Sequence, residues 1–281
     1  MPKTIEYFHD LNLNITTALK EDIGHGDLSA SLVDETQRAT ARVITKENAV
    51  VCGRPWFDAV FTHLDKSTAI NWYCEEGEQV EAGTLLCELK GNARVLLSGE
   101  RSALNFLQTL SATATTTSHY VAELKESKTQ LLDTRKTLPG LRLAQKYAVH
   151  CGGGRNHRIG LYDAILLKEN HIMAAGGIAK AISSAKSLYP NVLVEVETEN
   201  LEEVQQALQA AADIIMLDNF SLEMIADAVK LNANRAKLEV SGNVEINQLK
   251  TLASTQVDFI STGAITKHIQ AIDLSMRFDF D

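Results

Sequence analysis

The stretch that decides the fold runs from Leu132 to His171 and reads LDTRKTLPGLRLAQKYAVHCGGGRNHRIGLYDAILLKENH. Short apolar runs in it alternate with amphipathic segments, and a glycine run interrupts them at Gly152–Gly154. The stretch carries seven basic and three acidic residues, a local charge of +4, although the whole chain of 281 residues has a formal net charge of -9. Positive charge concentrated in this way in an acidic protein indicates a pocket for a small molecule with several negative charges.

The alternation of apolar and amphipathic segments continues toward the C-terminus. Apolar strands that alternate with helices are typical of a parallel sheet, either closed as a barrel or open as a layer. Over the last three intervals the strands recur about every twenty residues, which suits one strand and one helix per unit. The expected strands are Gln130–Asp133, Ala164–Lys168, Leu193–Glu197, Asp213–Leu217, Lys237–Val240 and Phe259–Ser261.

Polar residues stand at or just after the C-terminal end of each expected strand. In a barrel of parallel strands this end carries the active site, so we expect these side chains to converge on one pocket. In chain order, the strand ends and the loop between the first two supply the cations Arg135, Lys136, Arg158 and Lys168, the acids Glu197 and Asp218, and the segments Ser241-Gly242-Asn243 and Thr262-Gly263-Ala264.

Each of these groups suits a different part of a substrate pair. Guanidinium forks and ammonium point charges bind carboxylates and phosphates. The acid pair suits Mg²⁺, ribose hydroxyls or the positive charge that develops on a sugar ring. Loops with glycine and small hydroxyls before a helix offer backbone N–H groups to a phosphate. The combination predicts transfer of a phosphorylated sugar onto a small acid.

Some polar residues allow more than one interpretation. Glu195 and Glu197 share one face of a strand, so they either point into the pocket or form ion pairs with lysines of the barrel. His157 lies in the glycine-rich loop and is expected to be functional, whereas His150 has the helical context of a packed side chain.

The N-terminal part has a different pattern. We expect helices within Ile5–Glu21 and at Arg54–Phe61, strands within Ala39–Val51, and a small β-rich unit from Ile70 to Leu97. A long helix begins at Gly99, with a kink or break expected near Thr113–Thr117 because threonine is a poor helix former. The predicted domains are 1–114, an α/β domain, and 115–269, a catalytic β/α domain, with the tail 270–281 packing on the first.

Composition excludes several classes of protein. The chain is 45% hydrophobic and 22% charged, without an apolar run long enough for a membrane span, and its first residues lack a secretory pattern. We therefore expect a cytoplasmic protein whose four cysteines are reduced thiols. A pI near 5.4 argues against a nucleic-acid surface. Motifs for nucleoside triphosphates, zinc hydrolysis and nucleophilic serine are also missing from the sequence.

Several segments taken together carry a family resemblance. The chain resembles quinolinate phosphoribosyltransferases along nearly its full length, and one mild departure is Glu169, where the family often has aspartate. The matching segments are EDIGHGD at Glu21–Asp27, GERSALN at Gly99–Asn105, DTRKTLPG at Asp133–Gly140, GGGRNHR at Gly152–Arg158, LKENH at Leu167–His171, VEVE at Val194–Glu197, LDNF at Leu217–Phe220 and VSGN at Val240–Asn243.

The resemblance implies an activity and an architecture. The activity is conversion of quinolinate and phosphoribosyl pyrophosphate to nicotinate mononucleotide, CO₂ and pyrophosphate with Mg²⁺, a step of de novo NAD biosynthesis. The architecture is an open seven-stranded β/α barrel, similar to a TIM barrel, with an N-terminal α/β sandwich domain. It also implies a homodimer in which each N-terminal domain covers the partner's barrel.

The resemblance further implies a role for each site residue. Lys136, Lys168, Glu197 and Asp218 would be catalytic, and Glu197 and Asp218 would face the ribose and the metal–pyrophosphate side, with an indirect metal role. Thr134 would bind substrate, and Ser241–Asn243 and Thr262–Ala264 would hold phosphate. The quinolinate carboxylates would meet Arg135, Lys136, His157 and Arg158, joined by Arg101 from the other subunit.

Two rival functions remain at this stage. The first is a phosphoribosyltransferase of the same fold that acts on nicotinate or an unrelated acid, although two carboxylates explain the number of cations better than one. The second is a non-catalytic anion-binding or regulatory protein, which the joint presence of Lys136, Lys168, Glu197 and Asp218 disfavours.

Overall fold

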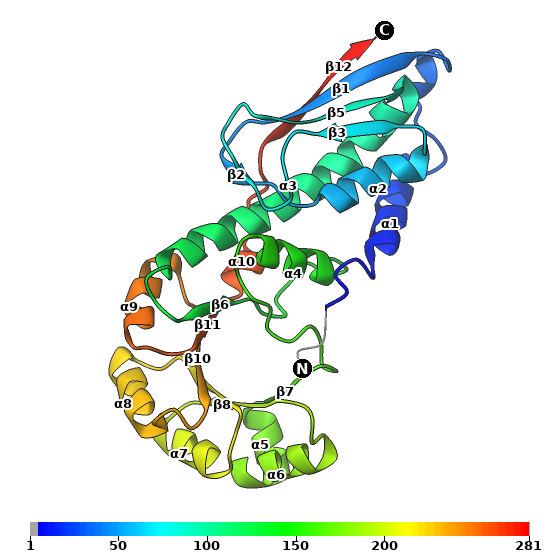
Figure 1. Ribbon diagram of the computed structural model, residues 1–281. Coiled ribbons are helices and arrows are strands. Elements are labelled where there is room, and N and C mark those ends of the chain that lie inside the picture. Colours follow the sequence, from blue (N-terminus) through cyan, green and yellow to red (C-terminus); the bar gives the residue numbers. More distant parts are fainter. Residues whose placement is uncertain (1–4, 281) are drawn as a thin grey trace. The chain divides into compact units, whose positions relative to one another are not determined.

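The computed structural model describes residues 5–280, which divide into two compact units (Figure 1). Residues 5–118, 138–153 and 268–280 form unit 1, and residues 119–137 and 154–267 form unit 2. The domain ranges predicted from the sequence were 1–114, 115–269 and 270–281, of which residues 1–4 and 281 lie outside the described residues. Segments that are distant in the chain therefore build each unit together.

Unit 1 contains an antiparallel four-stranded sheet with the strand order β12-β1-β5-β3 and helices packed on one face (Figure 1). In β1, alternate side chains are buried, as expected for a strand with one face on a core. The largest buried side chains include Trp56, Phe57 and Phe61 of α2, and Pro55 lies in the first turn of that helix, as predicted. The elements of unit 1 before α3 are α1 (Leu11–Ile23), β1 (Arg38–Thr45), β2 (Ala49–Val50), α2 (Arg54–Leu64), β3 (Ala69–Trp72), β4 (Gln79–Val80) and β5 (Leu85–Asn92).

The chain's C-terminal segment completes this sheet. β12 (Leu274–Phe280) pairs antiparallel with β1, and Val43 lies opposite Met276. The short helix α4 (Arg142–Cys151) also groups with unit 1. The first unit is therefore built from three separate parts of the sequence.

The long helix α3 (Ala93–Glu123) differs from the sequence prediction at two points. It begins six residues before Gly99 and continues through Thr113–Thr117, so the expected break is wrong. The hydroxyls of Thr113, Thr115 and Thr117 each donate to the backbone carbonyl four residues earlier, at 3.3, 2.7 and 2.7 Å. These bonds satisfy the hydroxyls inside the helix, and burial of all three side chains outweighs the weak helix propensity of threonine.

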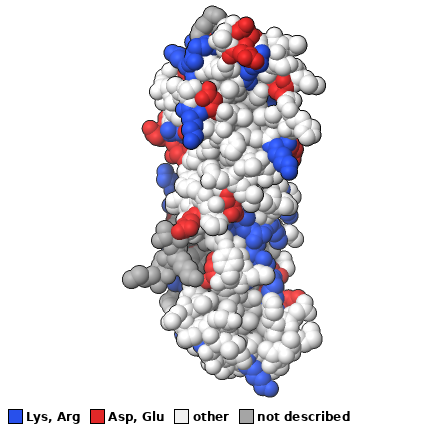
Figure 2. All heavy atoms as spheres, turned by 90° about the vertical axis from the view of Figure 1, so that its right-hand side faces the viewer, with Lys and Arg blue, Asp and Glu red and all other residues white. Residues whose placement is uncertain are grey.

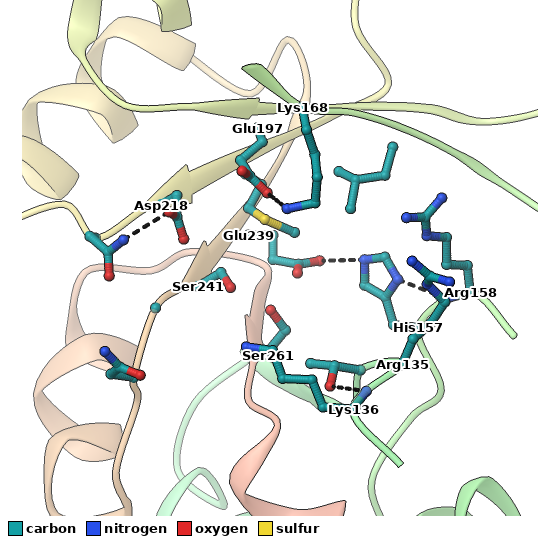
Figure 3. Close-up of a pocket in the computed structure, with 16 residues that line it drawn as sticks. Arg135, Lys136, His157, Arg158, Lys168, Glu197, Asp218, Glu239, Ser241 and Ser261 are labelled. Atoms are coloured by element: carbon teal, nitrogen blue, oxygen red, sulfur yellow. Dashed lines mark hydrogen bonds and ion pairs between the residues drawn. The ribbon is translucent and has the colours of Figure 1, made fainter. Parts of the chain in front are cut away.

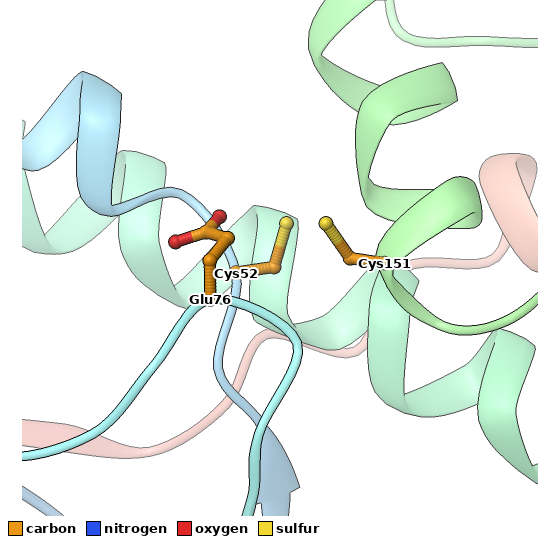
Figure 4. Close-up of side chains that lie close together, drawn as sticks. All are labelled: Cys52, Glu76 and Cys151. Atoms are coloured by element: carbon orange, nitrogen blue, oxygen red, sulfur yellow. The ribbon is translucent and has the colours of Figure 1, made fainter.

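Within the described residues the four cysteines are free thiols, as predicted. The sulfur atoms of Cys52 and Cys151 point toward one another beside Glu76 (Figure 4). Burial raises the pKa of the Cys52 thiol, whereas the hydrogen bond from Cys52 lowers the pKa of Cys151. Glu76 accepts from the backbone N–H groups of Gly53 and Arg54, at 2.6 and 3.2 Å, so this acid caps the N-terminus of α2.

Unit 2 is a curved, wholly parallel sheet, and the order of its six described strands is β6-β11-β10-β9-β8-β7. The helices α6 (Ile178–Leu188), α7 (Leu201–Gln209), α8 (Leu222–Asn232) and α9 (Leu249–Ser254) lie on its outer side (Figure 1). Each of the six predicted strands is confirmed to within two residues. The strands are β6 (Gln130–Leu132), β7 (Ile165–Leu167), β8 (Val194–Thr198), β9 (Ile214–Asp218), β10 (Lys237–Ser241) and β11 (Phe259–Ser261).

Two further features are the character of the helices and the distribution of charge on the surface. Among residues 5–280, none of the helices combines the length and apolar character needed to cross a membrane. Figure 2 shows one face of the described residues, on which basic and acidic side chains lie among larger uncharged areas.

Candidate active site

A pocket of about 500 Å³ opens at the C-terminal ends of the strands in unit 2 (Figure 3). All six strands, or the residues that directly follow them, contribute to its lining, as expected for a site on a parallel β/α sheet. The lining residues are Thr134, Arg135, Lys136, His157, Arg158, Leu166, Lys168, Glu197, Met216, Asp218, Asn219, Glu239, Ser241, Gly242, Asn243 and Ser261.

Most side chains selected from the sequence meet in this pocket, and four do not line it. Arg101 lies on the exposed side of α3, in unit 1. Thr262 is buried, and its hydroxyl donates to the Val244 carbonyl at 3.0 Å. Gly263 lies against Lys136, since a Cβ added to Gly263 would be 2.8 Å from Lys136 Cδ. Ala264 is the first residue of the short helix α10 (Ala264–Lys267). Residues 262–264 therefore support the pocket from behind.

One wall of the pocket is basic. The pKa of Arg158 is lowered, first by burial and second by the nearby charge of Arg135. The backbone of Lys136 is fixed on both sides: its N–H donates to Thr134 Oγ1 at 3.0 Å, and its carbonyl accepts from Thr266 Oγ1 at 2.9 Å. Like charges held together in this way favour an anionic ligand between them.

Two acids shape the loop that carries His157 and Arg158. Asp133 is fully buried at the end of β6 and accepts from Asn156 Nδ2 at 2.7 Å and from the His157 N–H at 2.8 Å. Asp163 accepts from the N–H groups of Ile159 and Gly160, at 2.8 and 2.9 Å. The loop is therefore held from both ends. The sequence indicated Asp133 only as a strand-end residue, without this structural role.

The opposite wall is acidic and partly neutralised. Lys168, just before α5 (Glu169–Ala175), forms an ion pair with Glu197 of β8 (Figure 3). Asp218 ends β9 and accepts from the side-chain amide of Asn219 at 2.8 Å. Both carboxylates face the pocket, so their oxygens are available to hydroxyl groups or to a hydrated cation.

The ends of β9 and β10 approach one another closely at Gly242. This residue has φ +109°, and a Cβ there would lie 2.2 Å from Asn219 Oδ1. The Asn219 N–H donates to the Ser241 carbonyl at 3.0 Å, which joins the two loops. Only glycine fits both the backbone angle and the space, and it brings Asp218 and Ser241 to the same rim.

Sequence reasoning missed Glu239, which lies at the floor of the pocket with its side chain fully buried. His157 Nε2 lies 2.9 Å from Glu195 Oε2 and 3.6 Å from Glu239 Oε2. Strand periodicity contains a signal for Glu239, because it shares a face with Ser241 two residues later. Met216 and Leu166 also line the pocket without having been selected.

Comparisons with known proteins agree with this architecture. The model of the quinolinate phosphoribosyl transferase N-terminal domain matches residues 27–111, and that of the C-terminal domain matches residues 113–277. The chain belongs to the quinolinate phosphoribosyl transferase family. The resemblance drawn from the sequence is thereby confirmed, and the two family domains adjoin within α3.

Individual members of the quinolinate phosphoribosyl transferase family are similar over most of their length. A probable nicotinate-nucleotide pyrophosphorylase [carboxylating] of Synechocystis is 46% identical over 92% of this chain and 89% of its own. The structure of the nicotinate-nucleotide pyrophosphorylase from Francisella tularensis has a TM-score of 0.95 at 50% identity, covering 99% of both chains. NadC from Streptococcus pyogenes has a TM-score of 0.94 at 39% identity, with the same coverage.

Proposed function

We propose that this protein transfers the phosphoribosyl group of phosphoribosyl pyrophosphate to quinolinate and releases CO₂ and pyrophosphate. The product is nicotinate mononucleotide, and the protein is then a pentosyltransferase of de novo NAD biosynthesis. The observation that carries the proposal is the pair Arg135 and Arg158 on one wall of a pocket whose other wall presents Glu197 and Asp218. A dicarboxylate would meet the two guanidinium groups, and the ribose ring, which becomes positively charged during transfer, would meet the two carboxylates.

The acidic wall suits the sugar. Displacement of pyrophosphate from a ribose carbon passes through a state with positive charge on the ring, which a nearby carboxylate stabilises. Glu197 is held by Lys168 and Asp218 by Asn219. Their carboxylates would supply the negative charge that stabilises this state, and would bind ribose hydroxyls. Their oxygens are also of the type that suits Mg²⁺, which when bound would neutralise the leaving pyrophosphate. Since Glu197 already pairs with Lys168, we favour contact with the metal through water or pyrophosphate.

The basic wall suits the acid. Arg135, Lys136 and Arg158 would orient the two carboxylates and neutralise them. Once the ring nitrogen is bonded to ribose it is cationic, so the bond to the adjacent carboxylate can break. As CO₂ leaves, the electron pair of that bond stays on the ring carbon beside the cationic nitrogen, and a proton from solvent then binds to this carbon. The protein contributes position and charge, and the substrate provides the electron sink.

Finer features of the family belong to the same proposal. The single parallel bridge between Leu132 and Arg155, beside β6, supports a seventh strand and hence an open seven-stranded barrel. We also propose a cytoplasmic homodimer with domains divided near residue 114, in which Arg101 completes the partner's site. The 241–243 loop, which lines the pocket, would bind phosphate, supported by 262–264.

One assay tests the function. The protein is incubated with quinolinate, phosphoribosyl pyrophosphate and Mg²⁺, and nicotinate mononucleotide and CO₂ are measured. Turnover with quinolinate and none with nicotinate is the expected result. Turnover with nicotinate alone would assign the other phosphoribosyltransferase activity, and inactivity with both would point to an anion-binding protein.

A further inference from the structure

The floor of the pocket contains a buried acid pair next to His157. Figure 3 shows one member of the pair, Glu239, beside the imidazole. Glu195 on β8 and Glu239 on β10 have side chains that are 5% and 0% exposed. Ligating atoms of Glu195, Glu239 and His157 all lie within 4.8 Å of one another. The groups that face Glu239 are Glu195, His157 and the Ser261 hydroxyl of β11. Two carboxyl groups therefore lie close together beneath a pocket built for anions.

Both ring nitrogens of His157 are engaged within the protein. Nδ1 accepts from the N–H of Arg158 at 2.8 Å, so this nitrogen carries a lone pair. In the neutral ring the proton is then on Nε2, where it is donated to Glu195 Oε2 at 2.9 Å. A substrate carboxylate would need an N–H donor, and His157 has already directed its donor to Glu195.

The acid pair cannot be stable as two anions. Among the described residues, no donor makes a hydrogen bond of good geometry to either Glu239 oxygen or to Glu195 Oε1. The Ser261 hydroxyl faces Glu239 and favours its charged form, but burial outweighs this contact, because a buried carboxylate with few donors is costly. Burial, and next the charge of Glu195, raise the pKa of Glu239 to about 8. A proton shared between the two carboxyl groups gives each a partner and removes one charge.

We propose that Glu239 is held as a neutral carboxylic acid that donates to Glu195, and that this pair positions His157 and, through it, the Arg158 backbone. The carboxylate of Glu195 then fixes the imidazole, and the imidazole fixes the loop that supplies Arg158 to the basic wall. His157, Glu195 and Glu239 are positioning residues, which revises the expected contact of His157 with the substrate. The part of this proposal that links the three residues to dicarboxylate binding rests on the proposed function.

The substitution Glu239→Gln tests the neutral state, because glutamine has the shape of the neutral acid and cannot ionise. Quinolinate affinity is measured by calorimetry at pH 7 and pH 9. The wild-type protein should bind about tenfold more weakly at pH 9, where Glu239 ionises beneath the dicarboxylate. In Glu239→Gln this loss should disappear, whereas Glu202→Gln, on the exposed side of α7, should retain it. An equal loss in all three proteins would overturn the proposal.

Two further measurements do not depend on the substrate. Nitrogen NMR of the wild-type protein should find His157 protonated at Nε2 and not at Nδ1; the opposite tautomer would contradict the arrangement.

The second measurement is thermal unfolding. A proton that Glu239 retains up to about pH 8 when folded, and loses near pH 4.5 when unfolded, makes stability fall as pH rises between these values.

The melting temperature of Glu239→Gln relative to wild type should therefore increase from pH 5 to pH 8, and a constant difference would contradict the proposal.

Metal analysis gives the last control. A divalent cation bound by the wild-type protein and lost from Glu239→Gln would show that a metal, not a proton, bridges the acids. If quinolinate fails to bind at all, the proposed function is wrong. The NMR, unfolding and metal measurements would still show whether Glu239 is neutral and whether it positions His157.

Discussion

At the scale of single residues, Lys136 and Arg158 test the basic wall. Lys136→Ala and Arg158→Ala should each lower kcat/KM for quinolinate by on the order of a hundredfold or more, because each removes a charge that positions the acid. The melting temperature should change little, since both side chains line the pocket instead of filling a core. Lys20→Ala, an exposed position on α1, is the matched control. Unchanged activity in either pocket variant would remove the site assignment.

Gly242 tests the junction of the β9 and β10 loops. Gly242→Ala adds a methyl group at φ +109° and 2.2 Å from Asn219 Oδ1, so Asn219 and the loop must move. We expect a loss of roughly 1–3 kcal/mol in the free energy of unfolding, together with weaker binding of phosphoribosyl pyrophosphate. Gly83→Ala is the control, because Gly83 also has positive φ (+88°) but has open space around it. Equal losses in the two variants would mean that the contact with Asn219 is unimportant.

The residues of the walls were predictable from sequence, whereas Glu239 at the floor was missed. Lys136, Lys168 and Asp218 stand where an apolar run ends, which is a local signal that periodicity detects. Glu239 lies inside the strand KLEVS, where a polar residue reads equally well as solvent-facing. Only the placement of β10 between β9 and β11 buries it. The use of both His157 nitrogens likewise depends on loop geometry that no spacing encodes.

At the scale of elements, the threonines of α3 offer a matched pair of substitutions. Thr115 Oγ1 donates to Ser111 and also accepts from the buried N–H of Val50 at 2.8 Å. Thr115→Val therefore leaves a buried donor unpaired and should cost about 1–3 kcal/mol in the free energy of unfolding. Thr117→Val removes only a donor to a helix carbonyl and should cost less. Chemical denaturation measures both, and a larger loss for Thr117→Val would contradict this account.

The same helix explains where element prediction failed. Intrinsic propensity disfavours a threonine cluster, but propensity is a weak preference that buried contacts override. The strands of unit 2 were predictable because each is a short apolar run, whatever its neighbours. Continuation of the helix through the threonines depends instead on contacts with residues more than fifty positions away, such as Val50 and Cys52.

At the scale of the whole molecule, chain order hides how unit 1 is built. β12, from the C-terminal end of the described chain, pairs with β1, and residues 138–153 group with the same unit. Local patterns identify such segments as strand or helix and do not give their partners. In contrast, the order of βα units in unit 2 follows the chain from β7 to β11.

The proposed dimer gives a prediction for the complete assembly. If Arg101 acts in the partner's site, Arg101→Ala and Lys136→Ala each inactivate both sites of their own homodimer. A hybrid dimer contains one site with both defects and one site with neither. Equal mixing with free subunit exchange makes half of the dimers hybrids, so activity should recover to about one quarter of the wild-type value.

The measurement needs proof of exchange, which two affinity tags on the two variants provide by sequential purification of the hybrid. The purified hybrid should then have about half of the wild-type activity, because one of its two sites is intact. If Arg101 instead acts within its own subunit, each site of the hybrid carries one defect, and the tagged hybrid stays inactive. That outcome would refute the shared site while leaving the assignment of Lys136 unaffected.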